Sequence, residues 1–96
     1  MDLIECRNQI NEIDDEMKAL FLKRMEVVKN VALYKIENNM PIFDASREAS
    51  MKERLSADTG DMKEYYLAFL EETVKQSKEY QKKIIDEINR WIDENK

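Results

Sequence analysis

The sequence predicts an all-α protein that consists of a long helix, a short helix and a second long helix. Its 96 residues include only one glycine and one proline, the residues that most often interrupt regular elements and form loops. Apolar residues recur at steps of three and four along both long segments, which is the periodicity of an amphipathic helix. Acidic residues stand where helices are expected to begin, and they suit the positive end of a helix. A chain of this length is expected to form one domain.

The first long helix is expected to begin at Asp2 and to stop near Asn39. Asp2 and Glu5 are spaced as in a capping box, and Pro41 disfavours helical geometry in the residue before it. A helix of this length extends about 54 Å at about 1.5 Å per residue. The apolar stripe that should be buried comprises Leu3, Cys6, Ile10, Ile13, Met17, Leu20, Val27 and Val31.

The short second helix is expected to follow Asp44, which suits an N-cap. It should end within residues 56–60, which contain the only glycine. Its inward face is expected to carry Glu48, Met51 and Leu55.

The third helix is expected to open at Asp61, which forms a second capping-box pattern with Glu64, and to run almost to the C-terminus. Its predicted inward stripe comprises Met62, Tyr66, Phe69, Thr73, Gln76 or Ser77, Tyr80, Ile84, Ile88 and Trp91.

The length of the first helix predicts an assembly. The helix is longer than the diameter of a 96-residue globule, so one chain cannot cover its apolar stripe. We therefore expect an intertwined homodimer, in which the first helices pack along each other and the other helices wrap around them. The alternative is an extended monomeric hairpin with an exposed apolar stripe, which tends to associate.

The composition argues against several classes of function. The net charge is -5, which is unlike a basic nucleic-acid-binding surface. The chain has no histidine and one cysteine, which removes histidine-based catalysis, intrachain disulfides and most zinc sites. We expect neither a signal peptide nor a membrane-spanning segment. The default is a soluble cytoplasmic protein without nucleic-acid or membrane partners.

Three cations interrupt or border the apolar stripe of the first helix. Arg24 lies on the stripe between Leu20 and Val27, and Arg7 and Lys35 lie beside it. A buried lone cation costs several kcal/mol unless an anionic group meets it. Other polar side chains are expected on the inward faces of the second and third helices: Asp44, Arg47, Glu48, Thr73, Ser77 and Gln81.

Each polar residue also has an ordinary structural explanation. Arg7 and Lys35, near helix ends, can extend their charged heads into solvent, whereas Arg24 would need a buried ion pair. Asp44 is first of all an N-cap. Glu48 is spaced for a surface pair with Lys52. Two further residues, Ser77 and Gln81, can set helix register in a dimer.

As a set, these residues predict a pocket of positive potential. The cations are joined by an amide donor and a hydroxyl, and the one inward acid cannot neutralise them. Such a pocket suits a small polyanion, in particular a dicarboxylate, because arginine matches carboxylates and lysine supplies a point charge. Without a good proton shuttle, catalysis there would depend on positioning and electrostatic stabilisation.

The ordered set resembles the all-helical chorismate mutases, the intertwined-dimer class. The matching features are Arg7, Arg24 within Lys-Arg-Met-Glu-Val-Val, Lys35 within Tyr-Lys-Ile, residues 41–48, and Ser77 followed four residues later by Gln81. They span essentially the whole chain. The resemblance implies a single chorismate mutase-like helical domain over residues 1–96.

This resemblance implies the rearrangement of chorismate to prephenate in aromatic amino-acid biosynthesis, a unimolecular [3,3] shift that uses no cofactor or metal. It implies that Arg24, together with Arg7 from the partner protomer, holds the two substrate carboxylates. Lys35 would contact a carboxylate and the ether oxygen, and Gln81 would donate to the same oxygen. The remaining substrate contacts would come from Glu48 to the ring hydroxyl, the backbone near Asp44, Arg47 and Ser77.

Two alternatives remain at the level of sequence. An isochorismate–pyruvate lyase on the same scaffold would share the cationic residues. A non-catalytic helical dimerisation module would instead pair Arg24 and Lys35 with carboxylates of the protein.

Overall fold

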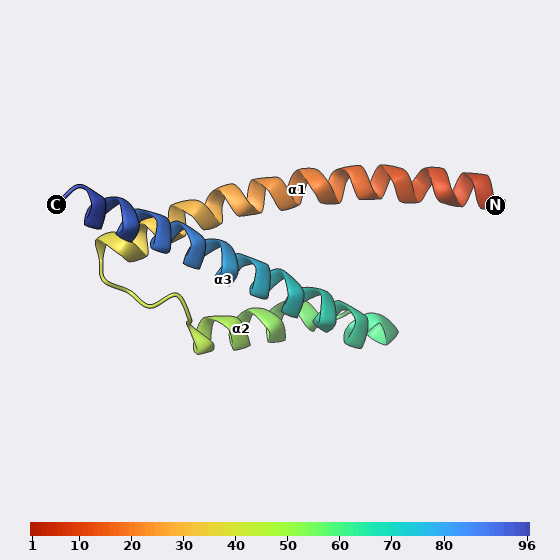
Figure 1. The fold of residues 1–96 in the computed structure, drawn as a ribbon. Helices are drawn as coiled ribbons and strands as arrows, with labels where there is room; N and C mark the ends of the chain where they lie inside the picture. The colour runs from red at the N-terminus through yellow and green to blue at the C-terminus, as the bar shows by residue number, and fades with distance from the viewer.

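The computed structural model describes residues 1–96 and contains only helices and their connections (Figure 1). The elements are α1 (Leu3–Glu37), α2 (Ala45–Ser56), the 3-10 turn η1 (Gly60–Met62) and α3 (Lys63–Glu94). The prediction of an all-α chain with long, short and long helices is therefore confirmed.

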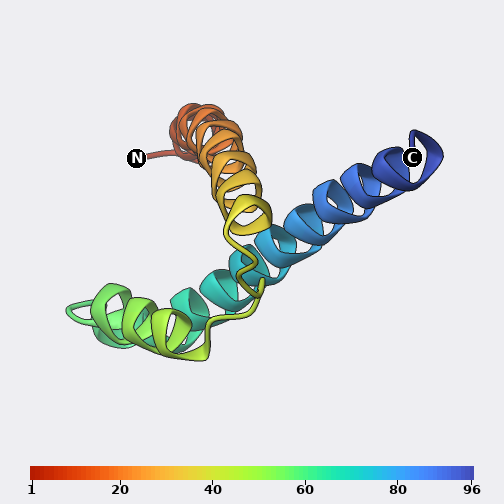
Figure 2. The same cartoon turned by 90° about the vertical axis from the view of Figure 1, so that its left-hand side faces the viewer.

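The helices form an open, elongated arrangement of 63 × 28 × 15 Å. α3 crosses the C-terminal half of α1, and α2 runs back alongside the first half of α3 (Figures 1 and 2). The N-terminal half of α1 extends beyond this crossing with no other element of the chain beside it. The arrangement places the loop at residues 38–44 and the start of α2 close to the crossing.

Side-chain caps begin the first two helices as predicted. The Oδ1 atom of Asp2 accepts a hydrogen bond from the Glu5 backbone at 2.8 Å, and that of Asp44 accepts one from the Arg47 backbone at 3.0 Å. α1 ends at Glu37, slightly before the expected stop near Asn39. There Asn39 adopts a left-handed conformation with φ of 53°, which turns the chain toward α2.

The start of the third helix differs from the prediction. Asp61 does not cap α3; it lies inside η1, and Met62 at the N-cap position makes no side-chain capping bond. The reason is the tight turn before it, in which the Met62 backbone donates to the Thr59 carbonyl at 3.1 Å. Gly60 takes the left-handed conformation that this turn requires, with φ of 56°.

The core is small and lies where α1 crosses α3. Ala32 has no exposed surface, so the two helices approach closely at this residue. The other buried residues are Val28, Met51, Leu70, Val74 and Ile84, together with the polar Ser56, Ser77 and Gln81.

The predicted buried stripe of the first helix is wrong for the single chain, and that of the third is confirmed only at Ser77 and Ile84. On α1 the buried residues are Val28 and Ala32, whereas the predicted stripe is largely exposed, because its N-terminal half has no neighbour in the chain. On α3 the inward face is shifted by about one residue from the prediction, so Phe69 and Trp91 are exposed. The observed buried stripe of α3 comprises Leu70, Val74, Ser77, Gln81 and Ile84.

The close approach at Ala32 gives a test of the fold. Replacing Ala32 with Leu should lower the free energy of unfolding by about 1–3 kcal/mol, because extra methylenes must force α1 away from α3. The matched control is Ala49→Leu on the exposed side of α2, which should change it by no more than about 0.5 kcal/mol. Urea denaturation followed by circular dichroism measures both. Equal stability of the two variants would contradict the packing at the crossing.

Candidate active site

A cleft of about 300 Å³ opens where the three helices meet. Seven of the eight predicted site residues line it. α1 contributes Arg24 and Lys35, and α3 contributes Ser77 and Gln81. The remaining three come from the N-cap and first turn of α2: Asp44, Arg47 and Glu48. The crossing of α1 and α3 therefore gathers residues that are up to 57 positions apart in sequence, Arg24 and Gln81 being the extremes.

Arg24 is held in place by a hydroxyl relay on α3. Its Nη1 atom donates to the Ser77 Oγ atom, and this hydroxyl donates to the Thr73 backbone carbonyl at 2.9 Å. Because the Ser77 proton is directed at that carbonyl, the Ser77 oxygen can act only as an acceptor toward Arg24. A guanidinium carries five N–H donors, so most of those on Arg24 have no partner in the chain. Ser77 thus orients Arg24 in the cleft.

Lys35 is fixed in the cleft by two acceptors. Its Nζ atom donates to the Ile42 carbonyl at 2.8 Å and to the Gln81 Oε1 atom at 3.0 Å. An ammonium group has three donors, so one N–H of Lys35 remains for a ligand. The contact with Ile42 also ties the loop between α1 and α2 to the cleft.

Gln81 lines the cleft and has an amide nitrogen with no partner in the chain. The side chain is 7% exposed, and its Oε1 atom is occupied by Lys35. A primary amide has two N–H donors, and those of Gln81 make no hydrogen bond within the chain. Lys35 and Gln81 therefore offer N–H donors from neighbouring points of one wall.

The acids of the cleft do not neutralise Arg24 or Lys35. Neither cation forms a salt bridge; Glu48 pairs instead with Lys78, at 3.2 Å between Oε1 and Nζ. The lining contains four cations and two acids, which leaves a local charge of +2 in a chain whose net charge is -5. The positive potential of the cleft therefore favours the binding of a dianion.

These contacts test the ordinary structural explanations that the sequence offers for the polar residues. The buried ion pair that would explain Arg24 is absent, and Lys35 bonds to an amide and a carbonyl instead of extending freely into solvent. The expected pair of Glu48 with Lys52 is also absent, because Lys52 lies 3.9 Å from Glu71. Asp44 caps α2, as expected, and it also lines the cleft.

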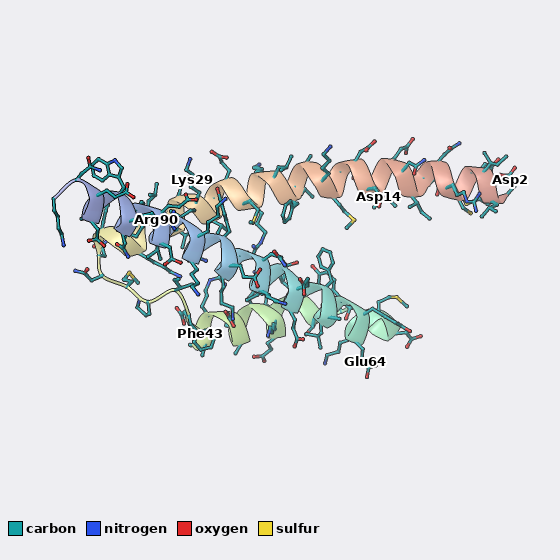
Figure 3. The ribbon with its side chains drawn as sticks, viewed as in Figure 1. Asp2, Asp14, Lys29, Phe43, Glu64 and Arg90 are labelled. Carbon is teal, nitrogen blue, oxygen red and sulfur yellow. The ribbon has the colours of Figure 1, made fainter.

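Arg7 does not join the cleft of its own chain. Arg7 is exposed and lies on the N-terminal half of α1, the part of the helix that projects beyond the crossing (Figure 3), and it does not line the cleft. Its predicted role in a partner's site stays a prediction.

Residue-by-residue reasoning missed several parts of the cleft. Lys78 lines it and is three residues before Gln81, so the helical spacing on α3 was an available signal. The Ile42 backbone carbonyl had no signal in the sequence, because a main-chain acceptor depends on the path of the loop. The apolar wall also includes Val27, Val28, Val31, Met51 and Val74.

A second, more apolar groove of about 660 Å³ lies between α1 and α3 on the side of the projecting half of α1. It shares Arg24 with the cleft and is lined by Met17, Leu20, Phe21 and Phe69. All four apolar side chains are about half exposed or more. This face of the chain therefore lacks a covering element.

The structure shows neither a metal-binding cluster nor a membrane-spanning helix. The chain holds no group of three or more His, Cys, Asp or Glu side chains arranged to bind a metal ion. None of its helices combines the length and apolar character needed to cross a membrane.

Comparison with known families agrees with the geometry of the cleft. The model of the family "Chorismate mutase type II" matches residues 6–82, a segment that contains all eight predicted site residues. The chain belongs to the type II chorismate mutase family. The resemblance predicted from the sequence is therefore confirmed.

Two curated relatives are similar to part of the chain. The chain is 44% identical over 55 residues to a bifunctional chorismate mutase/prephenate dehydratase of Buchnera aphidicola, a match that covers 57% of this chain and 14% of the relative. It is 36% identical over 58 residues to the T-protein of Haemophilus influenzae, covering 58% of the chain and 15% of that protein. The chain thus spans only a small part of the curated relatives it matches. No solved structure matches it. These matches give no support to a lyase or to a non-catalytic module.

Proposed function

We propose that this protein is a chorismate mutase, which rearranges chorismate to prephenate in aromatic amino-acid biosynthesis. The observation that carries the proposal is the pair of partly buried cations, Arg24 and Lys35, beside an amide donor and without an acid partner. Family membership supports the same activity. The substrate is a dicarboxylate, and the charge of the cleft is of the opposite sign and similar size.

Substrate binding would begin with the carboxylates. Arg24 has unused N–H donors on a rigid, planar group, and such a group can hold a carboxylate through two parallel hydrogen bonds. Arg47, at the exposed rim of the cleft, can attract the same anion as it enters. Holding the substrate in a chair-like conformer converts binding energy into a lower entropic barrier.

The chemical step needs stabilisation of one oxygen atom. The C–O bond of the ether breaks while a C–C bond forms, so negative charge grows on the ether oxygen in the transition state. The remaining N–H of Lys35 and the amide N–H of Gln81 lie next to each other and can both donate to it. A million-fold acceleration requires about 8 kcal/mol, an order of magnitude that positioning and two donors can supply together. Gln81 donates without titrating, so we expect a broad pH profile.

The proposed assembly is the intertwined homodimer, in which Arg7 reaches the cleft of the partner protomer. The apolar side chains of the projecting half of α1 have no cover within the chain, and the apolar groove beside Arg24 is of a size to receive a helix face. A second copy supplies both the missing cover and a helix of matching apolar character. The groove's continuity with the cleft through Arg24 would bring the partner's α1 next to the ligand.

The assigned role of Lys35 predicts a loss of rate without a loss of fold. Lys35→Ala removes one donor to the breaking bond, and the loss of a single such donor typically costs about 10²–10³ in kcat. Gln81 also loses the partner that orients its amide. The assay is the decrease in chorismate absorbance, with prephenate identified as the product.

The control for this test is Lys83→Ala on the exposed face of α3, which should keep the full rate. A near-wild-type rate in Lys35→Ala would refute the role of Lys35. Absence of turnover by the folded wild-type protein would refute the proposed function.

The dimer predicts complementation between two inactive variants. Arg7→Ala and Lys35→Ala each disable every site of their own homodimer. When the two are unfolded in urea and refolded together, half of the dimers are mixed and each mixed dimer has one intact site. Activity should therefore return to about a quarter of the wild-type value, as expected for a two-fold dimer. No recovery, despite mixed dimers detected by mass spectrometry, would contradict the supply of Arg7 by the partner.

A further inference from the structure

We infer that Lys78 is a positioning residue of the cleft, which holds the Glu48 carboxylate ready to accept a hydrogen bond from a ligand hydroxyl. This inference rests on the proposed function. It concerns a residue outside the predicted set, and it makes recognition of the hydroxyl depend on an ion pair within the chain.

The first support is the contact between the two side chains. The Lys78 Nζ atom lies 3.2 Å from the Glu48 Oε1 atom, and the Glu48 side chain is only 18% exposed. A largely buried carboxylate is costly unless a cation meets it. Lys78 is the only cation that forms a salt bridge with Glu48, since the neighbouring Lys52 pairs with Glu71 instead.

A second contact restricts where the ammonium group can be. The Lys78 Nζ atom also lies 4.8 Å from the centre of the Phe43 ring, within the range of a cation–π interaction. Figure 3 shows the labelled Phe43 where the loop meets the start of α2. Lys78 therefore joins α3 to both the loop before α2 and the first turn of α2. The position of Glu48 relative to Gln81 depends on this connection.

The hydrogen-bonding capacity of Glu48 fits a role in recognition. A carboxylate has about four acceptor positions, and the observed salt bridge engages only Oε1. Glu48 lines the cleft and makes no other side-chain hydrogen bond or ion pair in the chain. It can therefore keep Lys78 and accept from a ligand hydroxyl at the same time.

The pairing also separates Lys78 from the other cations of the cleft. Its charge is largely compensated by Glu48, whereas Arg24 and Lys35 have no acid partner. The ligand carboxylates are thus left to the unpaired cations. Lys78 should act through Glu48 and not directly on the ligand charge.

A double-mutant cycle tests the inference. Lys78→Met keeps most of the aliphatic stem but removes the charge, and kcat and KM for chorismate are measured with and without Glu48→Gln. In the wild-type background, KM should rise about tenfold, a coupling of the size found for residues in direct contact. In the Glu48→Gln background, where no carboxylate remains to be held, the same change should be less than about twofold.

Two further variants complete the experiment. Lys78→Arg should restore most of the loss, because it returns a cation to Glu48. Lys75→Met, an exposed lysine on the same helix, should leave kcat and KM unchanged. If Lys78→Met does not fold, Lys78→Gln replaces it in the same cycle, with a smaller effect in the same direction.

The outcomes separate the inference from the proposed function. An equal rise in KM in both backgrounds would show that Lys78 acts on the ligand directly, and an unchanged KM in both would show a surface pair; either result overturns the inference while leaving the mutase intact. A wild-type protein without turnover would refute the function itself.

Discussion

The structure depends on two partly buried cations that no acid of the chain neutralises. Arg24 and Lys35 lie where α1 crosses α3, and each is held by neutral acceptors: the Ser77 hydroxyl, the Gln81 amide and the Ile42 carbonyl. Neutral acceptors fix the direction of a cation but leave its charge largely uncompensated. The electrostatic potential where α1 crosses α3 is therefore positive. A dianion bound in the cleft would supply the missing charge.

The arrangement of the helices brings these cations and the other side chains of the cleft together. The small Ala32 lets α1 and α3 approach until side chains of both helices meet around one cleft. The cap at Asp44 fixes the first turn of α2, and so brings Arg47 and Glu48 to the cleft. The same geometry leaves half of α1 without cover, which a second chain would provide. Assembly and catalysis would then share Arg24, the residue common to the cleft and the apolar groove.

Much of this was predictable from sequence, for identifiable reasons. The helices and two of their caps follow from local spacing, as at Asp2 and Asp44. Seven residues that line the cleft were predicted because polar and charged groups on apolar helix faces need an explanation. The inward face of α3 was predicted one residue out of phase, since Phe69 and Trp91 suggest a core although this chain leaves them exposed. The anchoring of Lys35 by the Ile42 carbonyl depends on the path of a loop, which no side-chain pattern encodes.

The most direct test of these unpaired cations is the stability of Arg24→Met, measured by urea denaturation alongside chorismate turnover. Because Arg24 has no acid partner, its removal leaves no buried charge unpaired and relieves repulsion within the cleft. The free energy of unfolding should be equal to or higher than that of the wild type, while turnover is lost. A loss of stability of about 3–5 kcal/mol, as when a buried ion pair is broken, would show that Arg24 serves the fold and not a ligand.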